Sequence, residues 1–108
     1  MGAIATRIHD EVTSWDGVEA NSHRFEGVEF MMGRIEIGHI HGDKLADLPF
    51  PKKVRDELIE SGRAQPHHVL PESGWVSRLI KSESEVDEVI ALFRLNYDRI
   101  AARRTKQG

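Results

Sequence analysis

Two kinds of hydrophobic periodicity divide the chain and limit what it can fold into. Between residues 28 and 41, apolar and polar side chains alternate on both sides of Gly33, which is typical of two antiparallel strands joined by a turn. Between residues 86 and 101, apolar side chains recur every three or four positions, as one face of a helix requires. Ser82 and Glu85 have the spacing of a capping box before that helix. Both patterns in one chain favour the α+β class.

Shorter patterns complete the predicted order of elements. Residues 3–14 carry an apolar stripe at intervals of four and predict a first helix. A weaker strand is expected at about 18–25, a second helix at 51–61 with Gly62 as its stop, and a last strand at 75–80. The order is therefore helix, two or three strands, helix, strand, helix. It predicts a small antiparallel sheet of about four strands, with three helices mainly on one face.

Composition limits the class of protein further. A chain of 108 residues predicts a single domain over residues 1–108. No apolar run approaches the roughly 18 residues of a membrane span and no signal peptide is recognisable, so the expected location is the cytoplasm. The absence of cysteine excludes disulfides and thiolate chemistry. A net charge of −3 argues against a general nucleic-acid binder.

Four of the six histidines fall in two short clusters bounded by glycine and proline. The clusters are Gly38-His39-Ile40-His41-Gly42-Asp43 and Pro66-His67-His68-Val69-Leu70-Pro71, and Trp75 follows the second. Histidine is the side chain most readily used for proton transfer or metal binding near neutral pH. Two such clusters suggest one shared site.

The first cluster predicts a pocket at the end of a strand. Side chains two residues apart share a face, so Ile35, Ile37, His39 and His41 are expected to line up, with the two imidazoles about 7 Å apart. That row gives an apolar floor with polar groups at its rim. His39 or His41 is then a candidate general base, and Asp43 a candidate to accept a ring N–H and orient the imidazole. The alternative is that both histidines bond to backbone at the strand end.

The second cluster contributes candidate ligand-binding residues. His67 and His68 are adjacent, so in an extended segment they point to opposite sides and at most one reaches the pocket. Trp75 is expected to wall the pocket, or else to pack in the core. Arg34 is a candidate contact for an anionic group, although charged residues on these strands are more often solvated.

The same histidines can be combined into a metal site on paper. His39, His41 and one of His67 or His68 would supply the three imidazoles of a catalytic zinc, iron or copper centre. No carboxylate-containing metal motif accompanies them, so the sequence favours a site without metal or cofactor. The serines lack the Gly-x-Ser-x-Gly motif of a nucleophilic hydrolase.

The residues around both clusters resemble the luciferase-domain family. The resemblance rests on Gly33-Arg34-x-Glu36-Ile37-Gly38-His39-x-His41-Gly42-Asp43, Ala46-Asp47-Leu48-Pro49-Phe50-Pro51 and Pro66-His67-His68-Val69-Leu70-Pro71-x-Ser73-Gly74-Trp75-Val76-Ser77, and it covers about residues 25–100. The family takes its name from the fungal bioluminescence enzyme, which oxidises a pyrone luciferin with molecular oxygen. Most bacterial members are small stand-alone proteins. The resemblance implies a shared domain and does not imply light emission.

A looser resemblance concerns the second half of the chain. From His67 through Trp75 to the terminal helix, the element order is similar to that of small double-wing proteins of the MmcQ/YjbR type, which are α+β domains associated with DNA binding. This likeness supports the fold. Residues 1–50 carry 4 basic and 9 acidic side chains, which argues against DNA binding here.

Two functions fit these features. In the first, a histidine-lined pocket binds a small aromatic or enolic molecule, or oxidises it without a cofactor. In the second, the chain is a non-catalytic module that binds a ligand, a protein or a nucleic acid, and its histidines are structural. Whether the chain is an enzyme stays open between the two, and either is compatible with a monomer or a homodimer.

Overall fold

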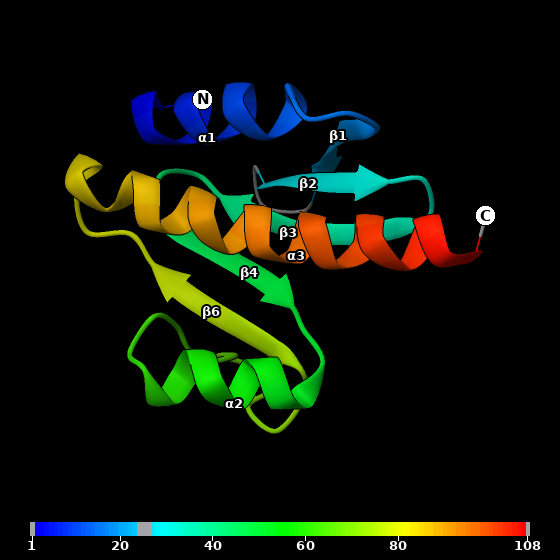
Figure 1. The fold of residues 1–108 in the computed structure, drawn as a ribbon. Coiled ribbons are helices and arrows are strands. Elements are labelled where there is room, and N and C mark those ends of the chain that lie inside the picture. The colour runs from blue at the N-terminus through cyan, green and yellow to red at the C-terminus, as the bar shows by residue number, and fades with distance from the viewer. Residues whose placement is uncertain (1, 24–26, 108) are drawn as a thin grey trace.

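The computed structural model describes residues 2–23 and 27–107 and has an α+β architecture (Figure 1). Its strands form one antiparallel sheet in the order β1-β2-β3-β4-β6-β5. The strands are β1 (Val18–His23), β2 (Gly27–Met32), β3 (Ile35–His41), β4 (Leu45–Pro49), β5 (Gln65–Pro66) and β6 (Trp75–Leu79). The class and the hairpin around Gly33 are confirmed. Phe25, which ended the weaker predicted strand, lies outside the described residues.

The sheet has six strands rather than the predicted four or so. β4 and β5 were missed, because neither carries a clear pattern of alternating side chains. β4 contains an aspartate and ends on Pro49, and proline normally argues against a strand between two others. Here the pairing of β4 with β3 ends at Asp47, so Pro49 has a strand neighbour only in β6. β5 is only two residues long.

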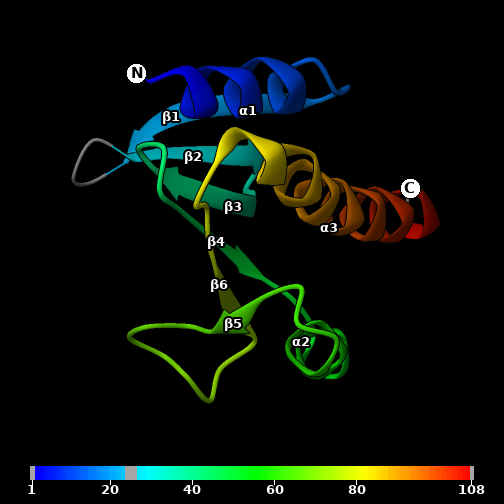
Figure 2. The ribbon, with the colours of Figure 1, turned by 90° about the vertical axis from the view of Figure 1, so that its left-hand side faces the viewer.

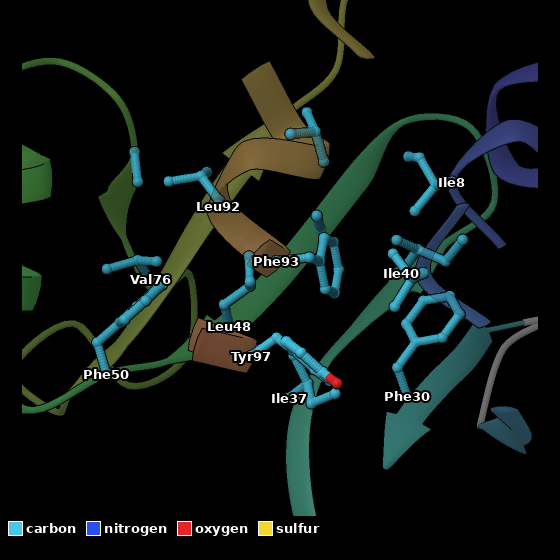
Figure 3. Packing of buried hydrophobic residues seen from close by; sticks show 14 of the residues in the cluster. Ile8, Phe30, Ile37, Ile40, Leu48, Phe50, Val76, Leu92, Phe93 and Tyr97 are labelled. Atoms are coloured by element: carbon cyan, nitrogen blue, oxygen red, sulfur yellow. The ribbon is translucent and has the colours of Figure 1, made fainter. Parts of the chain in front are cut away.

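Two helices cover one face of the sheet (Figures 1 and 2). α1 (Ala3–Thr13) packs against α3 (Val86–Gln107), and α3 crosses β3 and β4. Between helices and sheet lies the apolar core, in which the rings of Phe30 and Phe93 meet edge to face at 5.4 Å (Figure 3). α2 (Lys52–Glu60) contacts β5 and β6 instead. Among helices in the described part of the chain, none combines the length and apolar character that crossing a membrane requires.

The observed helix ends agree with the predicted ones only in part. Gly62 ends α2 with φ +78° and donates its N–H to the carbonyl of Ile59, as predicted. The prediction of a capping box before α3 is wrong, because the Ser82 hydroxyl makes no capping hydrogen bond and contacts the Ser84 hydroxyl instead. A single 3-10 turn, Glu83–Glu85, begins the helix instead.

A β-bulge in β3 separates the core face from the open face of the sheet. Phe30 pairs with Gly38, but the next residue of β2 pairs with Glu36, so Ile37 is an extra residue in β3. Ile37 is fully buried in the core, where Figure 3 shows it near Leu48 and Tyr97. The predicted single row of Ile35, Ile37, His39 and His41 is therefore wrong. The bulge leaves His39 on the face away from α3.

Gly38 lets the bulged strand approach α3 closely. A Cβ atom on Gly38 would lie 2.9 Å from Phe93, from Leu48 and from the backbone oxygen of Asp47. The buried side chain of Asn96 on α3 donates to the carbonyl of Ile37, the extra residue of the bulge, at 2.8 Å. Strand and helix are thus fixed to each other at the point where the strand turns toward the site.

We expect Gly38→Ala to lower the free energy of unfolding by about 3 kcal/mol, because three close contacts must be relieved in a packed core. Gly42→Ala is the matched control. Gly42 has φ +57°, and a Cβ atom added there would meet no other side chain or backbone atom within 4 Å. Its substitution should therefore cost only the backbone strain of about 1 kcal/mol. Urea denaturation of both variants checks the difference. Equal losses would show that contact with α3 does not require glycine at position 38.

Candidate functional site

Asp47 is the centre of the site on the open face of the sheet. The strand register places it between His39 on β3 and Ser77 on β6. Its side chain is 1% exposed. The Ser77 hydroxyl donates to its Oδ1 atom at 2.7 Å, which leaves Oδ2 facing the histidines. A buried carboxylate needs such partners, because an uncompensated charge in the interior is costly.

Four imidazoles surround the Oδ2 atom of Asp47. Their Nε2 atoms lie 3.3 Å from it in His39, 3.4 Å in His41, 3.8 Å in His67 and 3.3 Å in His68. The structure therefore brings both histidine clusters together at a single carboxylate oxygen. The strands supply one pair, and the segment that links β5 to β6 supplies the other (Figure 2).

Both adjacent histidines reach Asp47, so the expectation that only one could do so is wrong. It assumed an extended segment, but the chain bends directly after β5. The backbone N–H groups of Val69 and Leu70 donate to Nδ1 of His67, at 3.1 and 3.0 Å. The bend stacks the two imidazoles, with their centroids 4.4 Å apart, and both then face the carboxylate.

These hydrogen bonds determine which nitrogen of His67 carries the proton. Because Nδ1 accepts, the proton of the neutral ring lies on Nε2, which is directed at Asp47. Burial is the largest cause that lowers the pKa of His67, and the neighbouring imidazole of His68 adds to it. His67 is accordingly a neutral hydrogen-bond donor toward the site.

A second carboxylate holds His39 from its other side. Nδ1 of His39 lies 2.6 Å from Oε2 of Glu36. Burial by itself lowers the pKa of His39, but the hydrogen bonds to Asp47 and Glu36 outweigh it and raise this pKa to about 9. His39 between two carboxylates is a cation at neutral pH.

The charge of Asp47 is stabilised by the same contacts. Burial raises the pKa of Asp47, but hydrogen bonds from His39 and Ser77, followed by that from His68, hold it well below its usual range. The centre of the site is therefore a permanent negative charge enclosed by imidazoles.

A cavity of about 540 Å³ opens beside the cluster. Besides the four histidines and Asp47, its lining consists of Val69, Leu70 and Trp75. The Trp75 ring lies 5.4 Å from that of His39 and 5.9 Å from that of His67, between centroids. Val69 is 68% exposed and Leu70 50%, so two apolar side chains border a polar centre without being buried.

Two predicted site residues lie elsewhere. Asp43 accepts the backbone N–H of Ala5 with Oδ1 at 2.8 Å, in the first turn of α1. Glu36 and Asp47 contact imidazoles of the cluster instead. Arg34 is exposed in the turn before β3, at the end of that strand away from His41.

Arg78 on β6 is buried despite its charge. Its guanidinium donates to Glu85 and to Glu88, at 2.9 and 2.7 Å, and to the carbonyl of Arg63 at 3.0 Å. It sits on the opposite side of β6 from Ser77, because successive side chains of a strand alternate. Arg78 thus ties α3 to the sheet and takes no part in the site.

Sequence reasoning missed Asp47, Glu36 and Ser77 as members of the site. A charged residue between Ala46 and Leu48, both buried, is the signal that was available for Asp47. A strand that buries alternate residues on one side can direct a lone charge into a site on the other. Glu36 carried no comparable signal, because its approach to His39 depends on the bulge between them.

A model of the luciferase domain matches residues 34–96, which is more than half of the chain. The chain belongs to the luciferase-domain family. The matched segment contains all residues of the cluster, from Glu36 to Ser77. No curated protein and no solved structure matches the chain significantly. The resemblance to double-wing proteins stays a prediction.

We expect Ser77→Ala to lower the free energy of unfolding of this luciferase-domain protein by about 1–2 kcal/mol. The change removes a buried donor to the charged carboxylate of Asp47. Ser84→Ala, at an exposed hydroxyl, is the control and should change it by less than about 0.5 kcal/mol. Urea denaturation measures both. Identical stability of the two variants would contradict the assigned bond.

Proposed function

We propose that the pocket beside Trp75 binds a small molecule with a flat apolar body and an acidic hydroxyl group, such as a phenol or an enol, and takes the proton of that hydroxyl. One observation carries this proposal: four imidazoles and a buried carboxylate converge at one end of a cavity that is otherwise apolar. A few convergent polar groups in an apolar pocket are typical of small-molecule sites.

The apolar part of the lining supports a flat ligand. Trp75 offers a ring face or edge, and Val69 and Leu70 are each at least half exposed. A ligand that covers these side chains gains about 25 cal/mol for each Å² of apolar surface removed from water. Aromatic rings also stack or meet edge to face with a tryptophan.

The polar part of the lining supports an acidic hydroxyl. His67 presents an Nε2–H donor that can hydrogen-bond an ionised hydroxyl, and the charge of His39 partly offsets the carboxylates of Glu36 and Asp47. His41 is the better candidate base of the two predicted ones, because its side chain is 24% exposed and His39 is held between two carboxylates. A base must come within about 3 Å of the proton that it removes.

Family membership supports the same class of ligand. The resemblance noted from the sequence implies kinship with an enzyme that oxidises a pyrone enol with molecular oxygen. The enolate is the electron-rich form of such a molecule, so a pocket that generates it prepares it for oxidation. Fold alone does not establish the reaction, and binding is therefore tested first.

The test uses 4-hydroxy-6-methyl-2-pyrone and a hydroxylated naphthalene as probes, with affinity measured by calorimetry. We expect saturable binding to one site, an affinity loss of about tenfold or more in Trp75→Ala, and nearly full affinity in Trp75→Phe, which keeps a ring. Absorption spectra report the ionised form. At a pH about one unit below the pKa of the free probe, the bound probe should absorb as the anion.

Two results would contradict this function. One is the absence of saturable binding by either probe. The other is binding that Trp75→Ala and Leu70→Asp leave unchanged, which would place the probe elsewhere. An oxygen electrode then separates oxidation from binding alone, because only the former consumes dioxygen.

A further inference from the structure

We infer that the cluster is also a binding site for a divalent first-row transition-metal ion. The ligands are Nε2 of His39, Nε2 of His41 and Oδ2 of Asp47. His68 belongs to a second set of potential ligands with Asp47 and His67, and it supplies a fourth ligand only by moving toward the first three. This inference concerns an ion and not the organic ligand proposed above, so either can hold without the other.

The distances between these atoms are also compatible with metal coordination. Nitrogen–oxygen hydrogen bonds are usually 2.7–3.2 Å long, and one carboxylate oxygen accepts about two of them. Here four nitrogens lie 3.3–3.8 Å from a single oxygen. Ligand atoms bound about 2.0–2.2 Å from one ion are themselves about 3.0–3.6 Å apart. The separations of His39 and His41 from Asp47 fall in that interval.

The three principal ligands sit on two paired strands inside the sheet. His39 and His41 share a face of β3, and Asp47 is the direct neighbour of His39 on β4. Their ligand atoms all lie within 4.8 Å of one another. Because two paired strands hold them, little ordering is needed when an ion binds.

The ligand residues are held in place by neighbouring side chains, as metal ligands usually are. Nδ1 of His39 lies 2.6 Å from Glu36, which directs the Nε2 atom toward Asp47. An ion displaces the Nε2 proton of the cationic ring, and Nδ1–H stays on Glu36. A carboxylate behind a histidine in this way is the common support of a ligating imidazole. Ser77 occupies Oδ1 of Asp47, so that Oδ2 is the oxygen that remains for an ion.

Hydrogen bonding separates the roles of the two adjacent histidines. His67 accepts two backbone N–H groups with Nδ1, so the single proton of its neutral ring lies on Nε2, and an ion could bind there only to an imidazolate. His68 lies closer to Asp47, at 3.3 Å, and its side chain is half exposed. His68 can therefore move to complete a coordination sphere, and His67 donates a hydrogen bond to whatever the ion binds.

The ligand types indicate the class of ion. Imidazole suits zinc, iron, copper and nickel, whereas the hard ions Mg²⁺ and Ca²⁺ prefer oxygen ligands alone. Two imidazoles and one carboxylate on one side of an ion leave positions open toward the cavity, as in mononuclear iron(II) sites. With His68 added, the set also suits tetrahedral zinc.

The test uses the full chain without a histidine tag, stripped with a chelator and titrated with Co²⁺, as a spectroscopic probe, and with Zn²⁺. Calorimetry should give one ion per chain. The visible absorption of Co²⁺ reports its coordination, and the melting temperature should rise with ion concentration. The absence of saturable one-to-one binding would overturn the inference.

Variants then locate the ion. Asp47→Asn and His41→Gln each remove a ligand and should weaken binding about 100-fold or more. Glu36→Gln removes the negative charge behind His39 and should weaken binding about tenfold. His9→Gln, on α1 and bonded to Asp10, is the control that should retain full affinity. Circular dichroism of each stripped variant verifies folding. Unchanged affinity in both ligand variants would place the ion elsewhere and refute the site.

A matched pair tests the roles of the adjacent histidines. His67→Asn keeps an acceptor for the N–H groups of the bend and should retain Co²⁺ affinity within about threefold. His68→Gln should weaken it about tenfold. The reverse order would overturn the assignment of His68. Trp75→Ala should leave Co²⁺ binding intact, so failure of the organic probes and failure of the metal site are distinguishable.

Discussion

The charge of Asp47, buried in the middle of the sheet, is the constraint on which the rest of the site depends. Removing a carboxylate from water costs several kcal/mol, and only well-placed partners offset that cost. Strands β3 and β6 supply such partners because β4 lies between them. The segment after β5 supplies two more imidazoles. The strand order is thus what turns scattered polar residues into one cluster.

The bulge at Ile37 lets the same strand serve the core and the site. Without the extra residue, alternation would place Ile37 on the face of His39, away from the core. With it, Ile37 is buried against α3 while His39 and His41 face the cavity. The bulge also brings Glu36 to His39, so an irregularity of the backbone becomes part of the electrostatics of the site.

Local patterns predicted the helices and the hairpin well because those elements depend on near neighbours. The residues missed by sequence reasoning are those whose role depends on distant ones. Asp47 gains its importance from pairing with His39. Arg78 is buried because Glu85, in the turn before α3, and Glu88, in α3, approach it. Asp43, next to the first histidine cluster in sequence, instead binds the first turn of α1.

The sequence by itself determined the α+β class, the hairpin around Gly33, the long terminal helix and the presence of two histidine clusters, since composition and periodicity act locally. Only the tertiary structure decided that the clusters meet and that Asp47 is their centre. It also decided that both His67 and His68 face that carboxylate, since the bend depends on backbone bonds to the imidazole itself. Side chains far apart along the chain share an electrostatic environment only after the strands have paired, and no local pattern records that pairing.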